Sequence, residues 1–325
     1  MSPLVPEPAT SSHSGARIVL KARPTARQLA DRLRSPAPEG LEIYLDASDI
    51  TADDWLSRLL SVWDVQPWPT DFTTLVEGPI RSLDGTFFDL TVDSDANRLT
   101  IDRLTTFGKR IGAEAACIHL IAPTYDLSGT STEAGLQLVE ESVPLTRYYV
   151  DKCNNAGLVP TVENIPPVAR MRESLLMTST IGGPPEHLAH LAKCVPGLRF
   201  TFDTSHAALF LNAVNGEDGG DQKLRSLVRA LAESSDTRTM DNYIDVLDGL
   251  IETVHVSDAE GILGEGLAYG SGGIDLDHTV DRLIHSVRWI VTEVLEPDVD
   301  QSPNMRFAAD RIVERRALST AVLQA

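Results

Sequence analysis

The sequence has few cysteines and no cluster of basic residues. Its three cysteines, Cys117, Cys153 and Cys194, are widely spaced and form no CxxC pair. This pattern is typical of reduced thiols in a cytoplasmic protein, where they pack as small apolar side chains. The chain has 28 lysines and arginines against 47 acids, a formal net charge of −19. Nucleic-acid phosphates and anionic membrane surfaces repel such a chain, so we expect neither as a partner and predict a small-molecule substrate.

Long apolar runs are also missing. No stretch approaches the ~20 residues of a transmembrane helix, and the Pro- and Ser-rich start of the chain lacks the apolar run of a signal peptide. We expect residues 1–15 to form a flexible tail and residues 16–325 to form one domain. The composition, with 42% apolar and 23% charged residues, allows a large core. The sequence leaves open whether the chain forms a homo-oligomer.

Short apolar, β-branched segments recur along the chain, with amphipathic segments between them. This alternation predicts parallel strands joined by crossover helices. Eight strands favour a single closed (β/α)8 TIM barrel, with a doubly wound open sheet as the alternative. The expected strands are 16–22, 40–46, 72–79, 115–123, 159–165, 198–206, 252–260 and 289–297. The expected helices are 25–35, 51–63 with Thr51 as N-cap, 96–112, 132–157, 184–194, 224–234, 240–252, 275–287 and 306–323, and the longer expected loops are 79–95, 165–184 and 211–222.

Ionisable residues stand near the ends of most of these strands, where barrels of this kind place their active sites. Glu163, Asp203, His255 and Glu293 lie on the fifth to eighth strands, which are neighbours in a barrel. Apolar residues flank them, and unpaired carboxylates in such surroundings are costly and repel one another. A divalent cation resolves both problems. We therefore predict that these four residues bind a metal, with a buried polar network without metal as the alternative.

Three carboxylates and one imidazole form an oxygen-rich ligand set. It favours one Mn²⁺, Mg²⁺ or Co²⁺ ion, and Zn²⁺ is compatible with it. The segment DTSH either caps the end of the sixth strand or forms part of this metal site. We predict metal binding for Asp203, followed by a turn that brings His206 to the same mouth. On a continuing strand, an offset of three residues would point His206 to the opposite face.

Four segments carry a resemblance to a known superfamily. They are ENIPP, FDTSHAAL, HVSDAEG followed by GEGLAYGSGGIDL, and the late TEVLE. In this order and spacing they resemble the xylose isomerase-like TIM-barrel superfamily of sugar phosphate isomerases and epimerases, which includes the AP endonuclease (endonuclease IV) family 2. The resemblance spans residues 40–297.

The resemblance implies roles for several residues. The four predicted ligands would hold one divalent metal, and Glu163 and Glu293 would also act as the acid/base pair on the two faces of the substrate carbon. It implies that His206 contacts a substrate oxygen, and we expect Asp258 to lie at the same mouth and contact the substrate. A metal bound to the carbonyl and hydroxyl oxygens stabilises the enediolate that forms when a carboxylate removes the neighbouring proton.

Three positions bear on the nuclease branch of the superfamily. His119 matches a metal ligand of endonuclease IV, but Glu77 stands where many relatives carry histidine. The segment 264–266, Gly-Glu-Gly, stands where the nuclease family has an Asp-x-His pair. The departures at Glu77 and at 264–266 argue against a three-zinc centre. We therefore expect His119 and Glu77 to contact the substrate instead.

The sequence therefore predicts a metal-dependent isomerase or epimerase of carbohydrate metabolism that acts on a sugar, keto-sugar or polyol. The main alternative is a dehydratase of the inosose or dehydroshikimate type, which shares the metal and the proton abstraction. A DNA-repair phosphodiesterase predicts basic grooves and further His and Asp ligands. A non-catalytic sugar-binding protein predicts loss of the ligands. The sequence shows no cluster of basic residues and no further His and Asp ligands, and it keeps all four predicted metal ligands.

Overall fold

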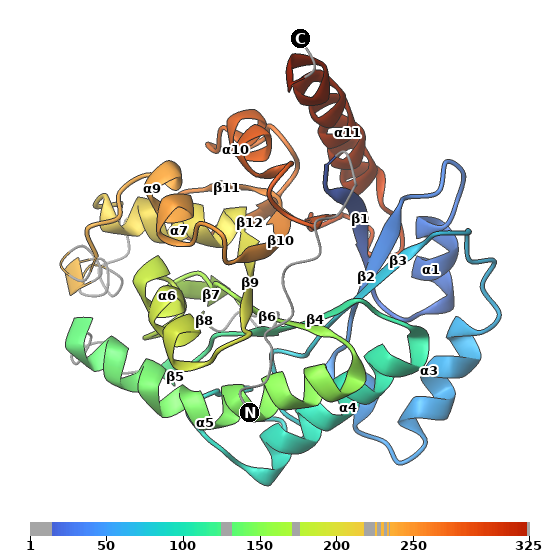
Figure 1. Ribbon diagram of the computed structural model, residues 1–325, viewed down its shortest axis with the longest axis horizontal. Coiled ribbons are helices and arrows are strands. Elements are labelled where there is room, and N and C mark those ends of the chain that lie inside the picture. The colour runs from blue at the N-terminus through green and yellow to red at the C-terminus, as the bar shows by residue number, and fades with distance from the viewer. Residues whose placement is uncertain are drawn as a thin grey trace, which may run out of the picture.

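Eight parallel strands close into a barrel in the computed structural model of the chain (Figure 1). The structure describes residues 15–124, 132–170, 176–217 and 235–323, with residues 225, 229, 230 and 233 between them. The strands follow one another around the barrel in chain order, and the last closes on the first. Their bounds are Arg17–Ala22 (β1), Gly40–Tyr44 (β2), Thr73–Glu77 (β3), Ala115–His119 (β4), Val159–Glu163 (β6), Arg199–Asp203 (β9), Ile251–Val256 (β10) and Trp289–Thr292 (β13). The predicted (β/α)8 TIM barrel is confirmed.

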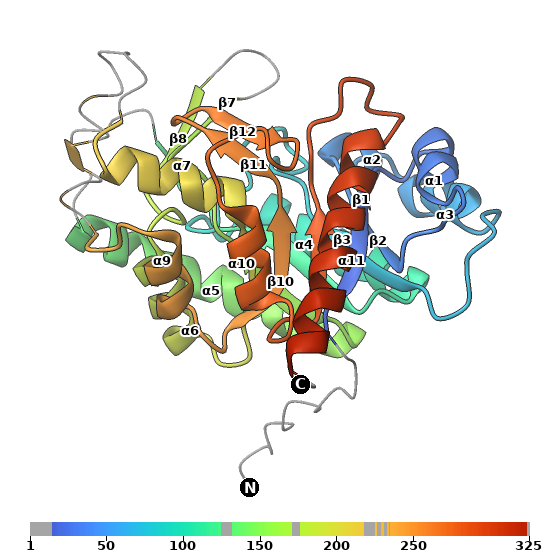
Figure 2. The same ribbon diagram turned by 90° about the horizontal axis from the view of Figure 1, so that it is seen from above.

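Helices surround the barrel (Figures 1 and 2). Most agree with the expected segments within a few residues, although α9 ends earlier than predicted. The predicted tail at residues 1–15, apart from Gly15, and most of the predicted helix 224–234 lie outside the described residues. The helix bounds are Ala26–Arg32 (α1), Ala47–Ile50 (α2), Trp55–Trp63 (α3), Asp95–Ile111 (α4), Thr132–Ala156 (α5), Pro185–Cys194 (α6), Thr204–Val214 (α7), Met240–Val246 (α9), Leu276–Leu283 (α10) and Pro303–Leu323 (α11).

The helix predicted at 51–63 begins differently from the expectation. Thr51 does not cap it but ends the short helix α2. The Asp46 carboxylate accepts a hydrogen bond from the Ser48 N–H at 3.0 Å, and the Asp49 carboxylate accepts one from the Asp46 N–H at 2.8 Å. This capping box starts a helix before Thr51. The next helix, α3, therefore begins only at Trp55.

Two small antiparallel sheets lie over the carboxyl end of the barrel (Figure 2). One contains Pro123–Thr124 (β5), Val168–Arg170 (β7) and Leu176–Ser179 (β8), and the other contains Asp258–Glu260 (β11) and Gly264–Leu267 (β12). The segment 165–184, expected to be a loop, thus contributes two strands. The expected loop 211–222 is also partly wrong, because α7 follows β9 directly and continues to Val214.

Side chains alternate between the two sides of each barrel strand. The outward-facing residues join the main hydrophobic core with the helices, as Ile18, Leu41, Val76 and Phe202 do. Two layers stand out among the inward-facing residues. An apolar layer near the amino ends of the strands contains Val19, Leu75, Ala115, Trp289 and Val291. A charged layer near the carboxyl ends contains Lys21, Glu42, Glu77, His119, Glu163, Asp203, His255 and Glu293.

The cysteines are free thiols, with Cys117 and Cys153 buried and Cys194 half-buried. Burial raises the pKa of Cys117 well above its usual value and that of Cys153 to about 12, so both stay neutral. Cys153 packs in the main hydrophobic core, whereas the Cys117 thiol faces Glu163, with Sγ 3.8 Å from Oε2. No helix in the described part of the chain is both long enough and apolar enough to cross a membrane.

Candidate metal centre

The charged layer collects one inward side chain from the carboxyl end of every barrel strand. Register places Lys21 beside Glu42, His119 beside Glu163, and Asp203 beside His255. Seven of its eight side chains are at most 10% exposed, whereas the Glu293 side chain is 33% exposed. Glu293 is therefore the member of the layer that a molecule in the barrel mouth can reach most easily.

The structure brings the four predicted metal ligands together. Glu163, Asp203, His255 and Glu293 each offer a ligand atom, and these atoms all lie within 4.8 Å of one another. His255 Nδ1 lies 2.6 Å from Glu293 Oε2 and 3.5 Å from Glu163 Oε2. Strand order explains the convergence, since β6, β9, β10 and β13 are consecutive around the barrel.

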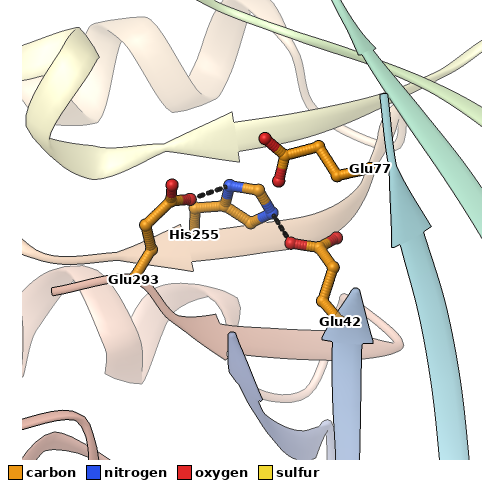
Figure 3. A group of neighbouring side chains, drawn as sticks. All are labelled: Glu42, Glu77, His255 and Glu293. Atoms are coloured by element: carbon orange, nitrogen blue, oxygen red, sulfur yellow. Dashed lines mark ion pairs between the residues drawn. The ribbon is translucent and has the colours of Figure 1, made fainter. Parts of the chain in front are cut away.

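The orientation of the buried ligand atoms fits a cation between them. His255 Nδ1 and Glu293 Oε2 are buried and close together, yet among the described residues neither makes a well-directed hydrogen bond. Leaving such atoms without a hydrogen bond is costly unless another partner compensates. The other imidazole nitrogen, Nε2, lies 2.9 Å from Glu42 Oε2, as in Figure 3. A carboxylate on the far side of a metal-binding imidazole is a common way to orient the ring.

Asp203 combines the two roles that DTSH allows. Its Oδ1 accepts hydrogen bonds from the Ser205 hydroxyl at 2.9 Å and the His206 N–H at 2.7 Å, and so caps the start of α7. All hydrogen bonds to this carboxylate in the described structure use Oδ1. The second oxygen is left for the ligand group. Asp203 is tied to β6 as well, because Asn164 accepts from its N–H at 2.7 Å and donates to its carbonyl at 3.0 Å.

Glu163 is surrounded by imidazoles. Its Oε1 lies 3.2 Å from His206 Nδ1, and its Oε2 lies 3.5 Å from His255 Nδ1 and 3.7 Å from His119 Nε2. Burial alone would raise the pKa of Glu163, but His255, His206 and His119 lower it well below its usual value. The carboxylate is therefore ionised and ready to bind a cation.

His206 is fixed at one nitrogen and faces an acid with the other. Its Nδ1 lies 2.9 Å from the Asn164 carbonyl oxygen, and its Nε2 lies 3.7 Å from Glu265 Oε2. Burial alone would lower the pKa of His206, but Asp203 and Glu163 raise it to about 10. The imidazole is thus protonated, with an N–H directed toward the region between α7 and β12.

Asp258 has a different place from the one expected. It is fully buried, and its carboxylate accepts hydrogen bonds from the backbone N–H groups of Ala259 at 2.9 Å, Gly272 at 2.9 Å and Ile274 at 3.0 Å. Both carboxylate oxygens are used, and they hold the glycine-rich loop that contains Gly272 and Ile274 against β11. The expectation of a substrate contact is corrected in this sense: the geometry gives Asp258 a loop-anchoring role.

His119 and Glu77 lie in the charged layer and contact each other. His119 Nε2 is 3.3 Å from Glu77 Oε1, and together with Glu163 the two residues form a further group whose ligand atoms lie within 4.8 Å. Burial raises the pKa of Glu77 to about 7, although Lys21 opposes this shift. Contact of either residue with a substrate stays a prediction.

Sequence reasoning missed three members of this region. Glu42 and Lys21 are not among the predicted site residues, and Glu265 enters only through the segment 264–266, which stands where the nuclease family has an Asp-x-His pair. The signal for Glu42 was alternation, because Leu41 and Ile43 face the helices and the residue between them must face the barrel interior.

Comparison with known proteins places the fold. No protein-family model matches the chain, and no curated protein matches it by sequence. Solved structures of an epimerase, an epimerase-like protein, a xylose isomerase domain protein and an AP endonuclease match over almost its whole length. At 11–14% identity this likeness shows the fold alone, and it confirms the TIM-barrel fold that the predicted resemblance implied.

Three of these solved structures show the range of the fold. One is an L-ribulose 3-epimerase, with a TM-score of 0.61 and 13% identity over 95% of this chain and 98% of that chain. A second is a D-tagatose 3-epimerase-like protein, with a TM-score of 0.59 and 14% identity over 94% and 99%. A third is an AP endonuclease, family 2, from Brucella melitensis, with a TM-score of 0.58 and 13% identity over 90% and 98%.

Proposed function

We propose that this protein is a divalent-metal-dependent isomerase or epimerase that acts on a sugar, keto-sugar or polyol. The observation that carries the proposal is the convergence of Glu163, Asp203, His255 and Glu293 at the barrel mouth, with Glu293 alone partly exposed. The epimerases among the solved structures of this fold support the same reaction class. Three carboxylates and one imidazole suit Mn²⁺, Mg²⁺ or Co²⁺, and Zn²⁺ is also compatible.

The chain's own groups divide the proton transfer between them. Burial alone would raise the pKa of Glu293, but Lys21 and His255 lower it to about 2, so it is held as a carboxylate. Glu293 is open to the mouth and removes the proton next to the substrate carbonyl. On the buried side, Glu163 would first accept the Nδ1 proton of the protonated His206, which lies 3.2 Å from its Oε1, and then return it to the substrate carbon, while His206 Nε2–H donates a hydrogen bond to a substrate oxygen. A bound divalent ion supplies stabilisation of the negative charge that develops on the substrate oxygens.

The test is proton exchange with solvent. The metal-loaded protein is incubated in D₂O with a panel of ketoses, keto-acids and inosose-like compounds and followed by NMR. The proposal predicts deuterium uptake at the carbon next to the carbonyl, with conversion to an epimer or aldose–ketose isomer. Loss of water from the substrate would instead identify a dehydratase. No uptake with any member of the panel, with or without Mn²⁺, would overturn the proposal.

A further inference from the structure

Lys21 places an ammonium group inside the charged layer. Its side chain, on β1, is nine-tenths buried, with 9% exposure. Its Nζ lies 2.6 Å from Glu293 Oε1 and 3.7 Å from Glu42 Oε2, and it forms an ion pair with Glu77. Lys21 is therefore a cation enclosed by three carboxylates.

The same carboxylates make up a second group with the geometry of a metal site. Glu42, Glu77, His255 and Glu293 offer ligand atoms that all lie within 4.8 Å of one another, and Figure 3 shows these side chains from β2, β3, β10 and the end of β13 converging. A cluster of acids alone would say little about a ligand. Here a second observation points to a bound cation, since the buried ammonium of Lys21 is directed into the cluster.

We propose that the Lys21 ammonium is the resident cation of this second group and that it limits the barrel to one divalent ion. The inference rests on the proposed function, because it takes the first ion to be bound by the Glu163 group. A second divalent ion would have to displace a charge that is covalently tethered and already neutralises these carboxylates. It would also meet the ammonium at contact distance, where charges of like sign repel strongly in a buried site.

The arrangement has a consequence for the chemistry. Two divalent ions held 3.5–4 Å apart form the clamp that many phosphoryl-transfer enzymes use. A single ion beside an ammonium lacks that clamp. Glu293 joins the two cationic positions, with Oε1 next to Lys21 Nζ and Oε2 next to His255 Nδ1. Lys21 is therefore a positioning residue, which fixes the rotation of the Glu293 carboxylate.

The test counts metal ions per chain. The protein is stripped with a chelator, equilibrated with excess Mn²⁺, freed from unbound metal and measured by elemental analysis. The wild-type chain is expected to hold about one ion and Lys21→Met about two, because the methionine has similar length and no charge. Lys21→Arg, which keeps the charge, is expected to stay at one.

Lys152→Met is the matched control. Lys152 lies on helix α5, outside the barrel, where its Nζ is 2.6 Å from Asp102 Oδ1 on α4, so its loss changes the net charge equally and should leave one ion. One ion in both wild type and Lys21→Met would overturn the inference and leave the proposed function standing. Two ions in the wild-type chain would also overturn it. No ion in the wild-type chain would overturn the proposed function itself.

A second variant covers misfolding of Lys21→Met, in which three carboxylates face one another without a cation. Lys21→Met/Glu42→Gln removes one of the repelling charges and keeps an amide oxygen at the same place. It is expected to fold and to bind two Mn²⁺ ions, with two separate steps of thermal stabilisation as Mn²⁺ is added. A single step and one ion per chain in this folded variant would overturn the inference.

Discussion

The lower part of the barrel interior is filled by the apolar layer, whereas a few residues further along the same strands the charged layer begins. β1 shows the contrast within two positions, since Val19 packs in the first layer and Lys21 lies among acids in the second. The apolar layer gains free energy from burial. The charged layer buries carboxylates, which costs free energy unless each charge is compensated. The charged layer is therefore held in place by the rest of the fold, and its arrangement suits the binding of a ligand.

The largest expected effect comes from the charged layer. Glu293→Gln keeps the shape of the side chain and removes the base, so we expect turnover to fall by about 10³-fold, within the range for loss of a general base. The unfolding free energy should also fall, because the charged Glu293 carboxylate is ion-paired with Lys21 and His255. Steady-state rates and chemical denaturation measured on the same preparation test this. A loss of less than tenfold would refute the assigned role.

A substitution in the apolar layer is expected to affect stability rather than the metal site. Trp289→Ala removes a fully buried side chain and should lower the unfolding free energy by about 3 kcal/mol, since truncation of a buried tryptophan leaves a cavity. Metal content per folded chain should stay the same. Denaturant titration and elemental analysis measure the two quantities. If the variant lost its metal while still folded, the two layers would not be separable.

Metal removal is expected to have a smaller effect on stability. An ion that binds only the folded chain stabilises it by about 2.7 kcal/mol when its concentration is 100 times its dissociation constant. Addition of chelator should therefore lower the midpoint of thermal unfolding of the wild-type protein, and Mn²⁺ should restore it. In Asp203→Asn the Mn²⁺-dependent shift should be much reduced. If the midpoint of thermal unfolding of the wild-type protein did not change on addition of Mn²⁺, the proposed site would be contradicted.

The smallest expected effect is a pH dependence confined to the charged layer. In the metal-free protein, the pKa of Glu293 is lowered from 4.5 to about 2, so the stability it contributes is lost as pH falls from 4.5 toward 2. The pKa of Glu77 is raised from 4.5 to about 7 and that of His206 from 6.5 to about 10, so their contributions are lost as pH rises through those values.

Stability of the metal-free protein should therefore be highest near pH 5 and change by at most ~1.4 kcal/mol per pH unit for each proton. Denaturant titrations across this range measure it. Trp289→Ala should give a curve of the same shape at lower stability, because the apolar layer carries no titrating group. A curve of different shape would show that the layers are coupled.

Much of the fold could be predicted from the sequence, because barrel strands and helices have different periodicities. The convergence of the four predicted ligands could also be inferred from the sequence. Each stands at the end of an apolar strand, and the closure of the barrel makes those four ends neighbours. Asp203 was harder to assign, since a residue that ends a strand and caps a helix shows the same sequence pattern for both roles.

The first two strands were harder to interpret. The second strand was expected at 40–46, which ends on Asp46, but β2 ends at Tyr44 and Asp46 caps α2. The acid that faces the barrel interior is Glu42, four residues earlier. It lies beside Lys21 because β1 and β2 pair in a register that places these two residues opposite each other. Asp258 was misplaced because its loop folds back over it, and a run of sequence does not show which backbone groups will return to a carboxylate.

The most direct test is isothermal titration of the metal-stripped chain with Mn²⁺. We predict one site per wild-type chain, an unchanged site in Trp289→Ala, and loss of the site or a large drop in affinity in both Glu163→Gln and Asp203→Asn. Absence of binding to the wild-type chain would contradict a metal centre in the charged layer. So would binding of Mn²⁺ by Glu163→Gln and Asp203→Asn with the same affinity as by the wild-type chain.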